Sequence, residues 1–125
     1  MARENKDSPF LYPKDPTVVI VDFGGAILLS EDEPTGIVNT RQYRSPEVTL
    51  LNVNKEWNEK TDLWSVGCIL MELYTGSLLF PTHDEVEHLA MIEKLCGPLP
   101  SELADFCNKD LKDIFDNDKY TEEEI

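Results

Sequence analysis

Positive charge is scarce in this chain of 125 residues, in which 11 Lys and Arg stand against 25 Asp and Glu and the formal net charge is −14. Such a field repels polyanions, so it argues against direct binding of nucleic acid or an anionic membrane and favours basic partners. Cysteine is also rare. Cys68, Cys96 and Cys107 are too widely spaced for a disulfide framework or a zinc knuckle. We expect three reduced core thiols in an intracellular protein.

Long apolar runs are missing as well. The most apolar stretch, residues 63–74, is shorter than the roughly 20 residues that a membrane span requires. The first residues lead into no apolar stretch of the kind found in signal peptides. Hydrophobic residues still make up 41% of the chain, which is enough for a core. We therefore expect a soluble domain, or part of one, with no membrane partner.

Hydrophobic patterning predicts a buried strand at residues 18–21, where four β-branched residues follow one another. The segment from there to Glu47 shows no sustained period, and a loop of that length is typical of a functional site. Residues 63–74 are apolar on every face, which predicts a helix buried all round. Thr61 or Asp62 should cap its start, and a glycine follows its end.

A second helix is predicted to open with the capping box Thr82-His83-Asp84-Glu85 and to end at Gly97. Its apolar stripe is spaced three, three and four residues apart, at Val86, Leu89, Ile92 and Cys96. A weaker helical pattern follows Ser101 and gives way to an acidic end.

Two segments carry residue types suited to phosphate chemistry. Asp22-Phe23-Gly24 follows the predicted strand, where an aspartate can hold a divalent cation against phosphate oxygens, although the same tripeptide also suits an ordinary turn. Residues 40–47 contain two arginines, which suggests recognition of an anion or a backbone carbonyl, with a solvated loop as the alternative.

Two histidines, His83 and His88, could suggest a metal site, but their spacing argues against it. Five helical residues separate them by about 140°, whereas the histidines of metalloproteases lie four residues apart on one face. The four-residue pairs are Asp84 with His88 and His83 with Glu87. We expect these side chains to pair on an exposed helix face.

The ordered set of motifs resembles the eukaryotic protein kinases. Asp22-Phe23-Gly24 looks like their metal-binding motif, and Ser45-Pro46-Glu47 stands about 25 residues later, where kinases have Ala-Pro-Glu. Residues 62–67 are similar to the start of the kinase central helix. The structural positions implied by this resemblance are Glu47, Asp62, Trp64 and Gly67.

The subfamily resemblance is to the LAMMER, or CDC-like, kinases of the CMGC group. Residues 87–94 look like the LAMMER signature, with Ile92 and Lys94 in place of its second Met and its Arg. The residues that match the signature are Glu87, His88, Leu89, Ala90, Met91 and Glu93. Residues 40–44 and 97–100 extend the likeness.

This resemblance implies an α+β kinase-like fold, of which the chain holds the mainly α part: a fragment of the C-lobe with its last strand, activation segment, central buried helix and following helices. The expected domain organisation is an irregular lead-in at 1–17, a partial kinase domain at 18–103 and a divergent acidic tail at 104–125.

The resemblance also implies residue roles. Asp22 would bind Mg²⁺ that bridges the phosphates of ATP, Phe23 would set the active or inactive state, and Gly24 would permit the turn. Thr40, Arg41 and Arg44 would serve substrate recognition, with Thr40 in the substrate-facing loop and Arg44 shaping the pocket beside the phosphorylation site. Glu47 would pair with an arginine late in the domain, but no arginine follows Arg44 in this sequence.

Several catalytic parts of a kinase are not found in the sequence. No Gly-x-Gly-x-x-Gly, Val-Ala-Ile-Lys or His-Arg-Asp precedes Asp22, so none of the residues present is assigned as catalytic. We expect the chain alone to be inactive and marginally folded, with an exposed apolar patch. The resemblance implies ATP-dependent phosphorylation of Ser/Thr, often in Ser/Arg-rich proteins, with autophosphorylation on Tyr, and a location in the nucleus.

Two alternatives to this interpretation stay open. The chain could be a kinase-derived docking module that binds basic partners without catalysis. A metal-dependent hydrolase built on His83 and His88 is the other.

Overall fold

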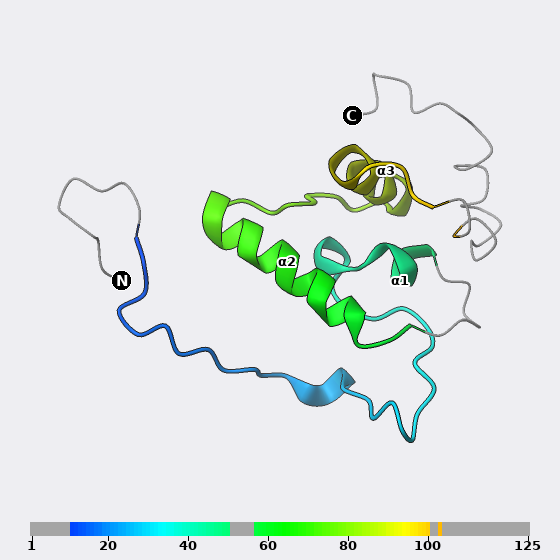
Figure 1. The fold of residues 1–125 in the computed structure, drawn as a ribbon, viewed down its shortest axis with the longest axis horizontal. Helices are drawn as coiled ribbons and strands as arrows, with labels where there is room; N and C mark the ends of the chain where they lie inside the picture. Colours follow the sequence, from blue (N-terminus) through cyan, green and yellow to red (C-terminus); the bar gives the residue numbers. More distant parts are fainter. Residues whose placement is uncertain (1–10, 51–56, 101–102, 104–125) are drawn as a thin grey trace.

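The structure, a computed structural model, describes residues 11–50, 57–100 and 103. In chain order its elements are the 3-10 helices η1 (Phe23–Gly25) and η2 (Arg41–Tyr43) and the α-helices α1 (Pro46–Leu50), α2 (Lys60–Thr75) and α3 (Glu85–Cys96). η2 packs against α2, and α1 packs against α3. Figure 1 shows the helices gathered together, with the extended chain before η1 running outside them.

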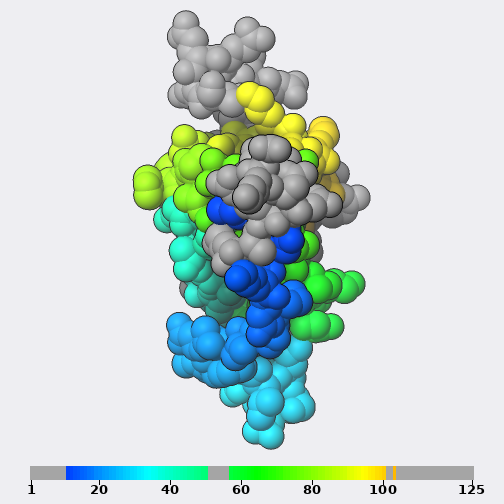
Figure 2. Space-filling model, turned by 90° about the vertical axis from the view of Figure 1, so that its left-hand side faces the viewer, coloured from blue at the N-terminus to red at the C-terminus, as the bar shows by residue number. Residues whose placement is uncertain are grey.

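The strand predicted at residues 18–21 does not form. These four residues are extended, but their side chains are 73–85% exposed, and no neighbouring strand pairs with them among the described residues. A strand is stable only when its backbone N–H and C=O groups find a partner strand, so β-branched composition alone does not produce one. Figure 2 shows this part of the chain, in blue, on the surface of the molecule.

Helix α2 begins earlier than its sequence signals predict. Glu59 occupies the N-cap position without a side-chain hydrogen bond, and Thr61 and Asp62 lie inside the first turn. The Thr61 hydroxyl is buried and pairs with the Ser45 hydroxyl at 2.7 Å, so it is not available as a cap. The predicted end is confirmed, because Gly76 takes the left-handed conformation, with φ of 76°, that closes the helix.

The expectation that α2 is buried all round is wrong for this structure. Only Thr61 and Cys68 are buried, because η2 and the core contact one side of the helix. The opposite side presents a row of large apolar side chains that are 42–78% exposed: Leu63, Val66, Ile69, Leu70, Met71, Leu73 and Tyr74. The predicted exposed apolar patch is therefore confirmed.

Helix α3 is capped two residues later than predicted. Asp84 is the N-cap, and its Oδ1 accepts hydrogen bonds from the backbone N–H groups of Val86 at 2.9 Å and Glu87 at 3.0 Å. The Thr82 hydroxyl instead bonds to the Glu87 carboxylate and to the backbone of Asp84. The predicted end at Gly97 is confirmed.

The core consists of two small clusters between the helices. Leu50 and Leu89 form one cluster, and Cys68, Phe80 and Ile92 form the other. Leu99 packs against both and so joins them.

Other core predictions have mixed outcomes. Val86 and Cys96 of the predicted stripe are exposed, so only Cys68 is a core thiol among the described cysteines. Cys107 and the predicted third helix, apart from Leu103, lie outside the described residues. None of the helices in the described parts of the chain has the length and apolar character of a membrane-spanning segment.

Candidate functional site

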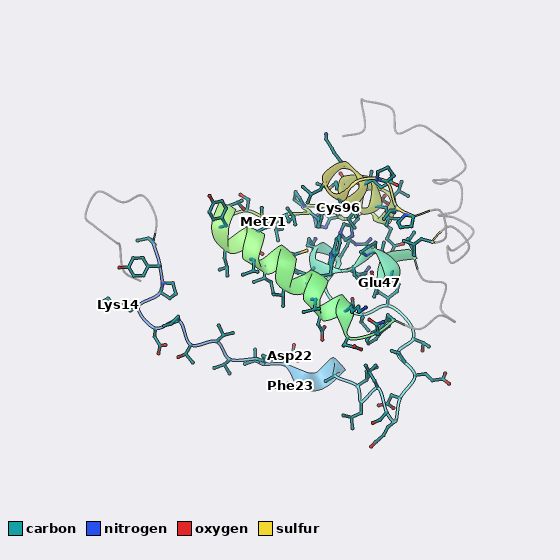
Figure 3. All side chains as sticks on the ribbon, viewed as in Figure 1. Lys14, Asp22, Phe23, Glu47, Met71 and Cys96 are labelled. Carbon is teal, nitrogen blue, oxygen red and sulfur yellow. The ribbon has the colours of Figure 1, made fainter. Side chains whose placement is uncertain are left out.

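Asp22, Phe23 and Gly24 lie at the start of η1, on the extended part of the chain. Figure 3 shows Asp22 and Phe23 away from Glu47 and from the α-helices. Asp22 has a left-handed backbone with φ of 64°, whereas Gly24 has no positive φ, so the unusual conformation belongs to the aspartate. Phe23 is 67% exposed and packs into no core.

The Asp22 carboxylate suits the role of a single magnesium ligand. It is exposed, so it can reach a cation carried by phosphate groups. Mg²⁺ in phosphate sites is bound by one or two carboxylates and otherwise by water and phosphate oxygens, so one aspartate is a reasonable part of such a site. Within the described ranges, no three His, Cys, Asp or Glu side chains are grouped to hold a metal ion, so Asp22 would need the nucleotide's phosphates as further ligands.

Residues 36–45, which we call the docked loop, are fixed by Arg44. The Arg44 side chain is buried, and it donates from Nε to the Val38 carbonyl at 3.1 Å and from Nη2 to the Asn39 carbonyl at 3.1 Å. Asn39 has a left-handed backbone with φ of 65°, a conformation that Asn tolerates better than most residues. Burial first, and then the charge of Arg41, lowers the pKa of Arg44, and Glu85 opposes that shift.

The docked loop is attached to α2 by a series of hydrogen bonds. The Tyr43 hydroxyl donates to Glu72 Oε2 at 2.6 Å, and this hydrogen bond is the main reason that the pKa of Tyr43 is raised. The Ser65 hydroxyl donates to the Tyr43 carbonyl at 2.8 Å. Asn39 Nδ2 donates to Ser65 Oγ at 3.3 Å, so one serine of α2 contacts the loop at two points.

The beginning and end of the docked loop have further anchors. Trp57 donates from Nε1 to the Gly36 carbonyl at 3.1 Å. Gln42 Nε2 donates to the Thr82 carbonyl at 2.9 Å, which ties the loop to the segment before α3. Thr40, predicted to face the substrate, is exposed at the N-cap of η2, so its hydroxyl is accessible to a binding partner.

Both arginines of the docked loop face Glu85, the first residue of α3. Glu85 Oε1 lies 3.5 Å from Arg41 Nη1 and 3.9 Å from Arg44 Nη1. These distances exceed normal hydrogen-bond lengths, so the attraction is mainly Coulombic. The structure thus brings Arg41 and Arg44 together as the sequence suggested and adds a carboxylate that the motif did not reveal.

His88 lies inside the core rather than on an exposed face. Its side chain is 0% exposed, and its ring tilts against Phe80 with centroids 5.2 Å apart. Neither ring nitrogen has a hydrogen-bond partner. Burial, and then the charges of Arg44 and Arg41, lower the pKa of His88 to about 4, so the ring is neutral at pH 7. The predicted surface pairing of Asp84 with His88 is wrong.

The remaining residues that match the LAMMER signature anchor α3 to the core and to neighbouring segments. Leu89 and Ala90 are buried and Met91 is half-buried against the core. Glu87 bonds to the Thr82 hydroxyl, and Glu93 Oε1 accepts the Leu99 N–H at 2.9 Å. The signature is therefore a set of helix anchors in this structure.

The four positions predicted to be structural differ in their environment. Trp64 is half-buried and stacks on Phe80 with ring centroids 6.1 Å apart and an interplanar angle of 8°. Glu47 is half-buried in α1, and Asp62 and Gly67 are exposed. A Cβ added at Gly67 would meet nothing within 4 Å, so the described residues do not require glycine there.

The class of the protein follows from a comparison with known families. The chain belongs to the protein kinase domain family, whose model matches residues 3–120. A crystal structure of a kinase domain superposes with a TM-score of 0.61 and 50% sequence identity, over 68% of this chain and 24% of that one. The kinase-like, mainly helical fold predicted from the sequence is confirmed.

Within that family, the relatives are of the LAMMER, or CDC-like, type. The chain is 46% identical over 102 residues to serine/threonine-protein kinase AFC1 of Arabidopsis thaliana, covering 80% of this chain and 21% of the relative. It is 48% identical over 89 residues to human dual specificity protein kinase CLK1, covering 71% of this chain and 18% of the relative. The chain thus spans about a fifth of the length of these relatives.

Proposed function

We propose that this chain provides the magnesium-binding aspartate, the activation segment and the central helix of a LAMMER-type protein kinase. The reaction is transfer of the γ-phosphoryl group of ATP to Ser or Thr, and to Tyr, of a protein substrate. The observation that supports this proposal best is the docked loop, which buried Arg44 and the α2 side chains Ser65 and Glu72 hold in one defined conformation. Phosphoryl transfer depends chiefly on positioning and charge stabilisation, so a preorganised loop is what the reaction requires.

Each residue has a limited role in this proposal. Asp22 would hold Mg²⁺, which would neutralise negative charge on the phosphates of ATP. Thr40 and Arg41 contact the substrate segment near the accepting hydroxyl, while Arg44 maintains the backbone of the docked loop by occupying two of its carbonyls. No residue of this sequence is assigned as the base that accepts the hydroxyl proton.

The substrates in this proposal are Ser/Arg-rich protein segments in the nucleus. The net charge of −14 favours binding of arginine-rich peptides and disfavours direct binding of nucleic acid. The names of two matched relatives, both called dual specificity protein kinases, are consistent with Ser/Thr and Tyr as acceptors.

The transcript that encodes the chain provides the first test. A reading frame that continues upstream of Met1 into a His-x-Asp catalytic loop and a lysine-bearing strand would support the proposal. An upstream sequence that contains neither would contradict catalysis.

A second candidate function is binding of basic partners without catalysis. It is favoured by the position of Asp22 and Phe23, which lie apart from the α-helices and from Glu47 (Figure 3), so the described residues do not assemble a nucleotide site. Binding of a Ser/Arg-rich peptide at low and high salt, with and without Mg-ATP, separates the two candidates. If the chain is a docking module, binding of the peptide should weaken with salt and should not depend on Mg-ATP. Phosphate transfer to the peptide would exclude a purely non-catalytic function.

A further inference from the structure

The two arginines of the docked loop need a counter-ion, and α3 provides one. We propose that Glu85 is the built-in counter-ion of the Arg41–Arg44 pair. In this proposal it is a positioning residue that holds the docked loop against the first turn of α3 and so makes a phosphate unnecessary there.

The contacts of Arg44 and Arg41 show why the Glu85 carboxylate matters for the charge of the pair. Its Nε and Nη2 are committed to the carbonyls of Val38 and Asn39, so Nη1 alone is directed to a counter-ion. Arg41 Nη1 is buried and has no hydrogen-bond partner, although it lies 3.5 Å from Glu85 Oε1. The carboxylate therefore balances the charge of the pair without satisfying every donor, and we expect those donors to hold a phosphate only when the negative charge of Glu85 is removed.

Other groups near the arginines do not replace Glu85. In residues 11–50, 57–100 and 103, it is the only acidic side chain that forms an ion pair with either arginine. His88, whose pKa both arginines lower, is neutral at pH 7 and carries no negative charge. Without Glu85, two guanidinium groups would repel each other with no local counter-charge.

The position of Glu85 on α3 makes it a fixed partner. It is the first residue of a 12-residue helix whose N-terminus is already capped by Asp84. A carboxylate in the first turn is stabilised by the helix dipole, so Glu85 is favoured there even apart from the arginines. Glu85 therefore joins the docked loop to the capped end of α3.

If Glu85 takes the place of an anion, then removing it should create an anion site. Phosphate is a suitable probe because its several oxygens can reach both guanidinium groups at once, which is the pairing that arginine makes best. The description of this loop as substrate-facing rests on the proposed function. The test below uses neither ATP nor peptide, so its failure would leave that function untouched.

The experiment measures amide hydrogen exchange of the full chain in inorganic phosphate and in chloride at matched ionic strength. The reporters are the N–H groups of Tyr43 and Arg44, which donate to the carbonyls of Thr40 and Arg41. In Glu85→Gln, we expect exchange at these amides to be roughly three- to tenfold faster in chloride, and phosphate to restore protection. The matched control is Glu59→Gln, which removes one negative charge at an exposed position with no side-chain cap bond.

Rescue by phosphate distinguishes a counter-ion from a residue that merely packs. The double variant Arg41→Gln/Glu85→Gln should not be rescued, and Glu85→Asp should stay close to wild type. The Gly76 N–H, which donates to the Glu72 carbonyl, serves as an internal reference for loss of the whole fold. The wild-type chain should show no phosphate-specific protection, and this measurement requires no variant. Phosphate-specific protection of wild type, or an unrescued but folded Glu85→Gln, would overturn the proposal.

Discussion

Burial of His88 makes the stability of this chain sensitive to acid. The imidazole is neutral in the folded protein because burial, Arg44 and Arg41 lower its pKa to about 4. In the unfolded chain its pKa is about 6.5. Between these two values the unfolded state binds more protons than the folded state, so the free energy of unfolding falls as the pH falls. The penalty disappears only as the pH rises well above 6.5.

The magnitude follows from the size of the shift. A difference of about 2.5 pKa units corresponds to about 3 kcal/mol lost by pH 4, of which about 2 kcal/mol is already lost at pH 5. That loss is a large part of the 5–15 kcal/mol that is typical of small domains. The chain should therefore be measurably less stable at pH 5 than at pH 7.

Urea unfolding at a series of pH values from 7 to 5, followed by circular dichroism, measures this effect. Wild type is compared with His88→Leu, which cannot take up the proton, and with His83→Gln, which removes an exposed histidine. We expect His83→Gln to follow wild type and His88→Leu to lose about 2 kcal/mol less between pH 7 and pH 5. The carboxylates are the same in all three proteins, so their contribution to acid sensitivity cancels in the comparison. Equal acid sensitivity of wild type and His88→Leu would refute the reasoning.

Three further substitutions and one double-mutant cycle test the core and the hydrogen bonding of α2. Phe80 is 2% exposed, so Phe80→Ala should lower the free energy of unfolding by about 3–5 kcal/mol. Leu73 is 77% exposed, so Leu73→Ala should change the free energy of unfolding by less than about 0.5 kcal/mol. Urea titrations measure both. Comparable losses for the two variants would contradict the described core. Tyr43→Phe removes the hydrogen bond to Glu72 and should cost about 1–2 kcal/mol; a double-mutant cycle with Glu72→Gln that shows no coupling would rule this bond out as a contributor.

Local sequence signals predicted where helices end better than they predicted which residues are buried. Gly76 and Gly97 were predictable because a backbone with positive φ favours glycine whatever surrounds it. The start of α2 was not, because the hydroxyl of Thr61 is used by Ser45, a residue 16 positions away in the sequence. Residues 18–21 failed as a strand for a related reason, since a strand depends on a partner that composition does not reveal.

The sequence could predict which motif residues belong to the candidate site, but it could not predict the contacts that hold them in place. Arg41 and Arg44 could be identified because a kinase-like motif contains them. Glu85, Glu72 and Ser65 hold the same loop from two different helices, and no local pattern marks them. His88 was assigned to an exposed face because its helical spacing to Asp84 suited pairing, and only the tertiary structure shows that Phe80 covers it.

The two tryptophans give this chain a pair of built-in optical probes. Trp57 donates its indole N–H to Gly36 at the start of the docked loop, whereas Trp64 stacks on Phe80 in the core. Release of the loop would expose one indole to water and leave the other stacked. With single-tryptophan variants, fluorescence could therefore separate a local opening from global melting, and the chain would need no external label for either measurement.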